Sequence, residues 1–319
     1  MNSSQQITTV LGEISPDDLG VTLMHEHVFC NLISEYRGDG WLNDGALAVE
    51  ELSRFKRAGG QSLVDLTLRG MGRQPQQVQR VSEATGLNIV VGTGLYRHPY
   101  LDSEWVDQNS VDQLARWMVD EIEVGIDGTG IRAGIIGEIG CDAFLTAHEE
   151  RVFRAAARAH RRTGVTISTH AARWPVGHVQ LDLLEEEGVN PRRVIIGHCD
   201  SVSDAGWMSS DDVMDYHESL VRRGAFVSFD HFGTAASSFD DVRALENVMS
   251  LIDKGFTRHI LLSQDVCFQS SLRARGGNGY DFLLTRIVPQ LREQGVSDET
   301  VSTILITNPR QALTGDRTG

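Results

Sequence analysis

Two histidines stand one residue apart in the apolar, β-branched stretch VTLMHEHVFC at residues 21–30. If this stretch forms a strand, residues two apart point to the same side, so His25 and His27 face one space and Glu26 points away. A pair of imidazoles on one face can hold a metal ion. The pair is equally compatible with two core histidines that are each hydrogen-bonded to a neighbour, so both interpretations stay open on this stretch alone.

Further ionisable residues close other apolar runs of the chain. They are Glu138 in GIIGEIG, His170 in TISTH, His198 in IIGH, Asp230 and His231 in AFVSFDH, and Asp265 in LLSQD. Burying charged groups and imidazoles together is costly unless they share a cation. Among these residues, four imidazoles and two carboxylates are the candidate ligands, namely His25, His27, His170, His198, Glu138 and Asp265. They exceed the set that one zinc ion normally takes, and they suit two divalent ions that share a carboxylate bridge and a hydroxide. We expect zinc, and manganese, cobalt or iron also fit nitrogen and oxygen ligands.

The elements that must position these residues recur regularly. Eight apolar runs rich in Val, Ile and Leu start near residues 21, 62, 88, 131, 165, 193, 225 and 259, and the segments between them have helical spacing. With no Pro-, Gly- or Ser-rich linker, this pattern predicts an α/β protein that forms one (β/α)8 TIM barrel domain over residues 1–319. The functional face of such a barrel lies at the C-terminal ends of its strands, which is where the ionisable residues fall.

Helix ends are also marked. EERVFRAAARAHRRTG ends in basic residues followed by glycine, as is typical of a helix C-terminus. In LITNPRQALTG, we expect Asn308 to cap a last short helix that has Pro309 at its first position.

The composition is that of a globular protein with ample core material, 319 residues of which 40% are hydrophobic. A formal net charge of −15, with no basic cluster, argues against a nucleic-acid partner. The sequence contains no run of about 18 apolar residues, the length that a membrane-spanning helix needs. The start MNSSQQITTVLGEISPDD lacks the features of an export signal. The four cysteines, Cys30, Cys141, Cys199 and Cys267, form no C-x-x-C pair, and we expect reduced thiols in a cytoplasmic protein.

In the order His25-x-His27, fourth-strand acid, His170, His198 and Asp265, the chain resembles the phosphotriesterase family of the amidohydrolase superfamily. The blocks LMHEHV, AGII, GVTISTHA, RVIIGHCD, GGNGYD and the terminal TNP are similar to family blocks over nearly the whole length. The resemblance implies a binuclear centre in which His25, His27 and Asp265 hold the more buried ion, and His170 and His198 the more exposed one. It also implies a homodimer.

Two departures from the family pattern are informative. The prototype phosphotriesterases and related lactonases carry a bridging carboxylated lysine after GII, where this chain has Gly137 and then Glu138, as in the phosphotriesterase-homology subgroup. A glutamate can bridge as a carbamate does, but a one-residue shift reverses the side-chain direction unless the backbone bulges, which Gly137 permits. The relay acid after the sixth-strand histidine is replaced by Ser201, so the relay either stops at His231 or uses Asp200.

The expected reaction is hydrolysis of a small-molecule substrate. Two cations lower the pKa of a bridging water toward neutrality, which gives a hydroxide nucleophile. Asp265 is placed to take the proton and to pass it to His231 or to the leaving group. We expect a carboxylic ester or lactone as substrate, an N-acyl amide as the alternative, and a phosphotriester only as a weak side activity.

Residues on the loops after the strands are candidates for the substrate pocket. They are Tyr96 and Arg97 on the third loop, Arg173 and Trp174 on the fifth, Phe232 on the seventh, and Gln269, Arg273 and Arg275 on the eighth. Family members that act on phosphorylated sugar lactones resemble one another in a lysine after the seventh strand and paired arginines after the eighth. Here those places read GTAAS and CFQSS, which disfavours a phosphorylated substrate.

The sequence fits two other functional classes less well. A mononuclear deaminase of the same superfamily would resemble HAGE at the fifth strand, with a glutamate three residues after the histidine, but that residue here is Arg173. A metal-binding barrel without catalysis is disfavoured because the ligands, the base and the source of the nucleophile are all present.

Overall fold

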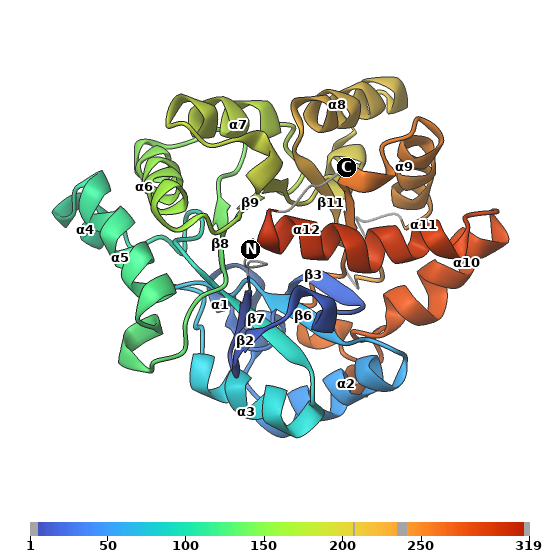
Figure 1. Cartoon of the computed structure of the whole chain (residues 1–319), viewed down its shortest axis with the longest axis horizontal. Coiled ribbons are helices and arrows are strands. Elements are labelled where there is room, and N and C mark those ends of the chain that lie inside the picture. Colours follow the sequence, from blue (N-terminus) through green and yellow to red (C-terminus); the bar gives the residue numbers. More distant parts are fainter. Residues whose placement is uncertain (1–5, 207, 235–240, 316–319) are drawn as a thin grey trace, which may run out of the picture.

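The computed structural model describes residues 6–206, 208–234 and 241–315. Its centre is a parallel sheet of eight strands in which each strand pairs with the next one along the chain (Figure 1). The strands are β3 (Thr22–Glu26), β6 (Ser62–Asp65), β7 (Asn88–Thr93), β8 (Ile135–Gly140), β9 (Ile167–His170), β10 (Val194–Ile196), β11 (Phe226–Phe229) and β12 (Ile260–Leu262). Each strand falls within one of the eight apolar runs, and the predicted single-domain (β/α)8 barrel is confirmed.

Helices follow the strands and surround the sheet (Figure 1). The longer ones are α2 (Gly45–Arg57), α3 (Pro75–Thr85), α5 (Val111–Glu123), α6 (Ala147–Thr163), α7 (Gly177–Glu186), α8 (Ser210–Arg223) and α9 (Asp241–Asp253). Local sequence explains their bounds: α6 begins at a capping box made by Thr146 and Glu149, and Gly164 ends it in the left-handed conformation with φ 74°. The glycine predicted to follow this helix is therefore confirmed as its end.

Shorter elements connect these units. β1 (Ile7–Thr9) and β2 (Gly12–Ile14) form an antiparallel hairpin, and β4 (Cys30–Asn31) pairs with β5 (Trp41–Leu42) in the loop after β3. That loop also carries α1 (Ile33–Tyr36), and α4 (Ser103–Gln108) follows β7. Within the described parts of the chain, no helix is both long and apolar enough to cross a membrane.

One end of the barrel interior is filled by apolar side chains from seven strands. They are Met24, Val64, Val90, Ile135, Ile195, Phe226 and Leu261. Ile7 of the hairpin and Ala312 and Leu313 of the last helix join this cluster. In Figure 1 the hairpin and that helix lie over the centre of the ring. The polar residues described below occupy the opposite end, where the strands finish.

Strand β3 does not alternate as strictly as expected. Its pairing with β6 shifts register between Leu23 and Glu26, and Met24 lies in the barrel core although its neighbour His25 faces the polar cluster. His25 and His27 nevertheless share one space, and the carboxylate of Glu26 points elsewhere, as predicted.

The expected helix cap at Asn308 is wrong. After α10 (Val288–Glu293), the elements α11 (Asp298–Ser302) and α12 (Asn308–Thr314) are joined by a π-helical segment over Thr303–Thr307, and Asn308 has helical dihedral angles. The wider turns precede Pro309, whose missing N–H cannot make the regular helical bond. The amide of Asn308 instead donates to the carbonyls of Thr257 and Ile260 at 2.8 and 2.7 Å, which anchors the helix to the start of β12.

Candidate metal centre

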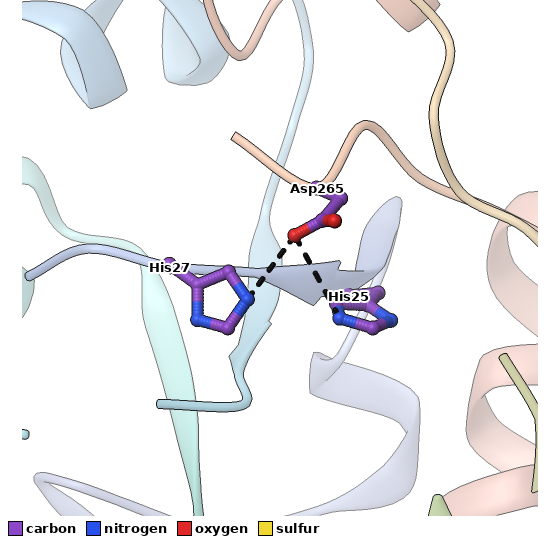
Figure 2. A group of neighbouring side chains, drawn as sticks. All are labelled: His25, His27 and Asp265. Carbon is purple, nitrogen blue, oxygen red and sulfur yellow. Dashed lines mark ion pairs between the residues drawn. The ribbon is translucent and has the colours of Figure 1, made fainter. Parts of the chain in front are cut away.

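The six predicted ligands converge at the C-terminal ends of the strands. They are His25, His27, Glu138, His170, His198 and Asp265. The five from β3, β8, β9 and the end of β10 are at most 5% exposed, and the Asp265 side chain is 12% exposed. Figure 2 shows the imidazoles of His25, on β3, and His27, directly after it, pointing toward the carboxylate of Asp265, which lies on the segment after β12.

His25, His27 and Asp265 form the first group. Oδ1 of Asp265 lies 3.1 Å from Nε2 of His27 and 3.8 Å from Nε2 of His25 (Figure 2). Donor atoms around a tetrahedral ion with bonds of about 2.0 Å are about 3.3 Å apart. Nε2 of His25 and Oδ1 of Asp265 are buried and have no hydrogen-bond partner among the described residues. Buried ligand atoms in this arrangement fit a cation that all three side chains share.

The second group is formed by Glu138, His170 and His198. Oε2 of Glu138 lies 2.9 Å from Nδ1 of His170 and 3.4 Å from Nε2 of His198. The same carboxylate also faces the first group, since Oε1 lies 3.3 Å from Nε2 of His27 and Oε2 lies 3.3 Å from Nε2 of His25. Glu138 therefore stands between the two groups, and together they fit a binuclear metal site.

The backbone irregularity that lets Glu138 face inward is present. The pairing of β8 with β9 shifts register between Ile136 and Ile139, and Gly137 has φ 122°, a conformation that L side chains rarely adopt. A Cβ atom on Gly137 would lie 2.1 Å from the carbonyl oxygen of Ser168. Only glycine fits at this position, so Gly137 is part of what places the carboxylate.

Asp230 holds one histidine of each group. Nδ1 of His25 donates to Oδ2 of Asp230 at 3.1 Å, and Nδ1 of His198 donates to Oδ1 at 2.8 Å. His27 is held instead by the hydroxyl of Thr67, 2.9 Å from its Nδ1. Such partners turn the Nε2 atoms of the three rings toward the shared space. The sequence placed Asp230 at a strand end without assigning it this role, and no sequence signal pointed to Thr67.

The charges of the cluster shift its titration. Burial raises the pKa of Glu138, but His25 and His170 outweigh it and hold the pKa well below its usual value. Burial lowers the pKa of His27 and His198, but the neighbouring carboxylates raise it to about 9 and about 10 respectively. Burial and the charge of His198 lower the pKa of His170 to about 3. Positive charge in this space thus stabilises the buried carboxylates, and a metal ion would supply that charge.

His231 and Asp200 lie next to Asp265 on the side away from His25 and His27 in the order expected for a proton relay. Oδ2 of Asp265 lies 3.5 Å from Nε2 of His231, and Nδ1 of His231 donates to Oδ1 of Asp200 at 2.8 Å. Asp200 therefore contacts His231 as one of the two alternatives required, and a relay through it stays a prediction. Ser201 lies elsewhere, because its hydroxyl donates to the carbonyl of His198 and accepts the backbone N–H of Arg173, both at 2.7 Å.

Two predicted pocket residues contact the cluster directly. The hydroxyl of Tyr96 lies 3.2 Å from Nδ1 of His170, and Nε of Arg97 lies 3.3 Å from Nε2 of the same ring. Arg97 also pairs with Glu35 at 2.8 Å and with Asp142 at 3.4 Å, two acids that sequence reasoning missed.

The other predicted pocket residues have different surroundings. Gln269 donates to the carbonyl of Trp41 at 2.6 Å, and the Arg273 side chain donates to Asp281 at 2.8 Å. Phe232 is buried in the main hydrophobic core, and Trp174 packs beside Cys141, Ala171 and Val176. Arg173 and Arg275 are exposed. A pocket role for these six residues stays a prediction.

Comparison with known proteins gives a consistent picture. The family model described as the phosphotriesterase family matches residues 5–313. The phosphotriesterase homology protein of Escherichia coli is 40% identical over 93% of this chain and 99% of its own length. The N-acetyltaurine hydrolase of Dictyostelium discoideum is 31% identical over 97% of this chain and 98% of its own. The crystal structure of a lactonase from Listeria monocytogenes superposes with a TM-score of 0.88 at 27% identity, over 97% of this chain and 99% of that one.

Proposed function

Because the chain belongs to the phosphotriesterase family, we propose that it is a binuclear metal-dependent hydrolase that cleaves a carboxylic ester or a lactone. The observation that carries this proposal is the carboxylate of Glu138, which faces His25 and His27 on one side and His170 and His198 on the other. A lactonase with the same fold supports the choice of substrate.

His25, His27 and Asp265 would hold one ion, His170 and His198 the other, and Glu138 both. Bound there, divalent ions such as zinc would lower the pKa of a shared water toward neutrality and polarise the scissile carbonyl. Asp265 would accept the proton that the attacking water loses, and its second oxygen faces His231, to which the proton would pass.

His231 is set up to receive that proton and pass it to the leaving group. Its Nδ1–H donates to Asp200, which leaves Nε2 as the acceptor facing Asp265. The backbone N–H of His231 also donates to Asp200, at 2.7 Å, so the ring is held in one orientation. Tyr96 and Arg97 lie beside His170, where they can contact the substrate.

An N-acyl amide is the second candidate substrate. N-acetyltaurine hydrolases are about 31% identical to this chain over nearly its whole length. An amine is a poor leaving group that must be protonated as it departs, and the relay from Asp265 through His231 to Asp200 suits that demand.

A substrate panel tests the proposal. The enzyme reconstituted with zinc or manganese is assayed on lactones, carboxylic esters, N-acetylated amines that include N-acetyltaurine, and an organophosphate triester, with Asp265→Asn as the inactive control.

We expect the preferred ester or lactone to exceed the triester in kcat/KM by at least about tenfold, or about 1.4 kcal/mol of transition-state stabilisation. Comparable rates on the triester would refute the substrate assignment, and amides as the best class would make the enzyme an amidase. Two bound ions with no turnover on any class would mean a metal-binding barrel without catalysis.

We also propose that the enzyme is a cytoplasmic homodimer. The four cysteines are buried and unpaired, as reducing conditions keep them. Sedimentation equilibrium of the purified protein tests the dimer, and a monomer at micromolar concentration would refute it.

A further inference from the structure

Glu26, the last residue of β3, lies between His25 and His27 and takes no part in the mechanism above. It is completely buried, at 0% exposure. Its carboxylate accepts three hydrogen bonds, and all three come from the segment that follows β12. Oε1 accepts the hydroxyl of Ser263 at 2.8 Å and the backbone N–H of Gln264 at 2.9 Å, and Oε2 accepts the backbone N–H of Val266 at 2.9 Å.

The residue enclosed by these bonds is Asp265. The N–H groups on either side of it, those of Gln264 and Val266, both go to Glu26, and its own N–H donates to the carbonyl of His25 at 3.1 Å. Asp265 has φ 47°, a left-handed conformation that is unfavourable for a residue other than glycine and persists only where the surroundings hold it. Three consecutive N–H groups fixed to β3 provide that hold.

These bonds also lie at the seam of the barrel. β3 and β12 are the two ends of the eight-stranded sheet, and within the described chain no strand ladder joins them. Besides the backbone bond from Asp265 to His25, side chains make the join: the N–H of His25 donates to the hydroxyl of Ser263 at 2.9 Å, and that hydroxyl donates to Glu26. The same carboxylate therefore closes the seam and fixes the backbone from which Asp265 projects.

We propose that Glu26 is a positioning residue for the metal centre. Its carboxylate sets Oδ1 of Asp265 toward His25 and His27, so the ion shared by these three side chains depends on Glu26 although Glu26 does not touch it. The effect on metal binding rests on the proposed metal-dependent function. The clamp, by which we mean the hydrogen bonds from the Gln264 and Val266 N–H groups to Glu26, requires no metal ion.

Glu51 offers a matched control. It lies on α2, is 1% exposed, and its carboxylate accepts the backbone N–H groups of Arg273 and Ala274, both at 3.0 Å, further along the same loop. Glu51→Gln and Glu26→Gln remove the same kind of clamp from one loop, but only Glu26→Gln acts at Asp265. In Glu26→Gln the new amide group keeps the volume and places a donor where the Val266 N–H needs an acceptor.

The experiment compares the full-length wild type, Glu26→Gln, Ser263→Ala and Glu51→Gln. Cobalt(II) affinity is measured by chelator competition, the visible spectrum of the cobalt-loaded protein reports on ligand geometry, and urea unfolding reports on stability. We expect Glu26→Gln to weaken the cobalt affinity of the ion held by His25, His27 and Asp265 by about tenfold to a hundredfold and to change the spectrum. Ser263→Ala keeps both amide bonds to Glu26 and should shift the affinity less, in the same direction. Glu51→Gln should be destabilised and keep the wild-type affinity and spectrum.

A folded Glu26→Gln with wild-type affinity and spectrum would overturn the proposal, as would equal changes in Glu51→Gln. If Glu26→Gln does not fold, an unchanged cobalt affinity in Ser263→Ala would overturn it. Hydrogen exchange of the metal-free protein separates this inference from the proposed function. Glu26→Gln should lose protection at the amides of Gln264 and Val266, and unchanged protection would disprove the clamp even in a chain that binds no metal.

Discussion

The carboxylate of Asp200 binds His231 twice, because it accepts the Nδ1–H of the ring at 2.8 Å and the backbone N–H at 2.7 Å. The other ring nitrogen lies 3.5 Å from Oδ2 of Asp265. The acid that the family prototype places one residue later is a serine here, and Asp200 at the neighbouring position is the group that orients His231. In the proposed mechanism Asp265, His231 and Asp200 have separate tasks, which substitutions can distinguish.

Substituting His231 by Asn should leave both metal ions bound and lower kcat by about tenfold to a thousandfold, because a positioned proton shuttle is lost. The loss should shrink along a series of esters with better leaving groups, which need less proton assistance. Asp200→Asn should show the same leaving-group trend with a smaller loss. Ser201→Ala is the control, and it should leave the trend unchanged. An unaltered rate in His231→Asn with a poor leaving group would remove His231 from the mechanism, and metal loss in that variant would make it a ligand.

Substituting Glu138 by Ala should lower the metal content from about two equivalents, as measured by elemental analysis, because this carboxylate faces both groups of histidines. Glu121→Ala is the control. Glu121 is also a buried acid, but it is paired with Arg73, and its loss should reduce stability without reducing metal content. Glu138→Ala with both ions and full activity would show that Glu138 is not the bridge.

Asp230→Asn should weaken the binding of both ions, since Asp230 holds His25 in one group and His198 in the other. We expect the affinity for each ion to fall about tenfold to a hundredfold, which is the usual effect of removing a carboxylate that holds a ligating histidine. Thr67→Val frees only His27 and should weaken only one ion. Zinc titrations against a chelator resolve the two affinities. A single weakened site in Asp230→Asn, or two in Thr67→Val, would contradict this assignment.

His217 should make the fold acid-sensitive. It is buried on α8, where its Nε2–H donates to the carbonyl of Cys199 at 2.8 Å, and burial lowers its pKa from 6.5 to about 4. The unfolded chain binds this proton near pH 6.5 and the folded chain only near pH 4, so acidification between these values favours unfolding. From pH 7 to pH 5 the group should remove about 2 kcal/mol of the free energy of unfolding.

His217→Gln tests this dependence, because its amide can keep the bond to Cys199 and does not titrate. Urea unfolding of the metal-free proteins is compared at both pH values, so that metal release does not enter. The free energy of unfolding of the variant should fall by about 2 kcal/mol less than that of the wild type. Parallel pH curves for the two proteins would show that His217 is not the titrating group.

Much of the fold was accessible from the sequence because its signals are local. A parallel strand buried on both faces needs a continuous apolar run, and the helices between such runs carry their own caps, as Thr146, Glu149 and Gly164 do for α6. Once eight such units are recognised, barrel geometry gathers the strand ends at one face. The residue types at those ends then indicated metal chemistry before any contact was known.

Tertiary structure decided what depends on register and on atoms far apart in the chain. The inward direction of Glu138 depends on a register shift against β9, and the choice of Asp200 over Ser201 depends on how the backbone turns after β10. Asn308 does not cap the helix, because its side-chain amide donates to carbonyls about fifty residues earlier in the chain. Glu26 looked only like the residue that points away from the histidines, and its three partners lie more than 230 residues later. Residue types can be read from the sequence, whereas the hydrogen-bond partner of each polar atom depends on how the barrel closes.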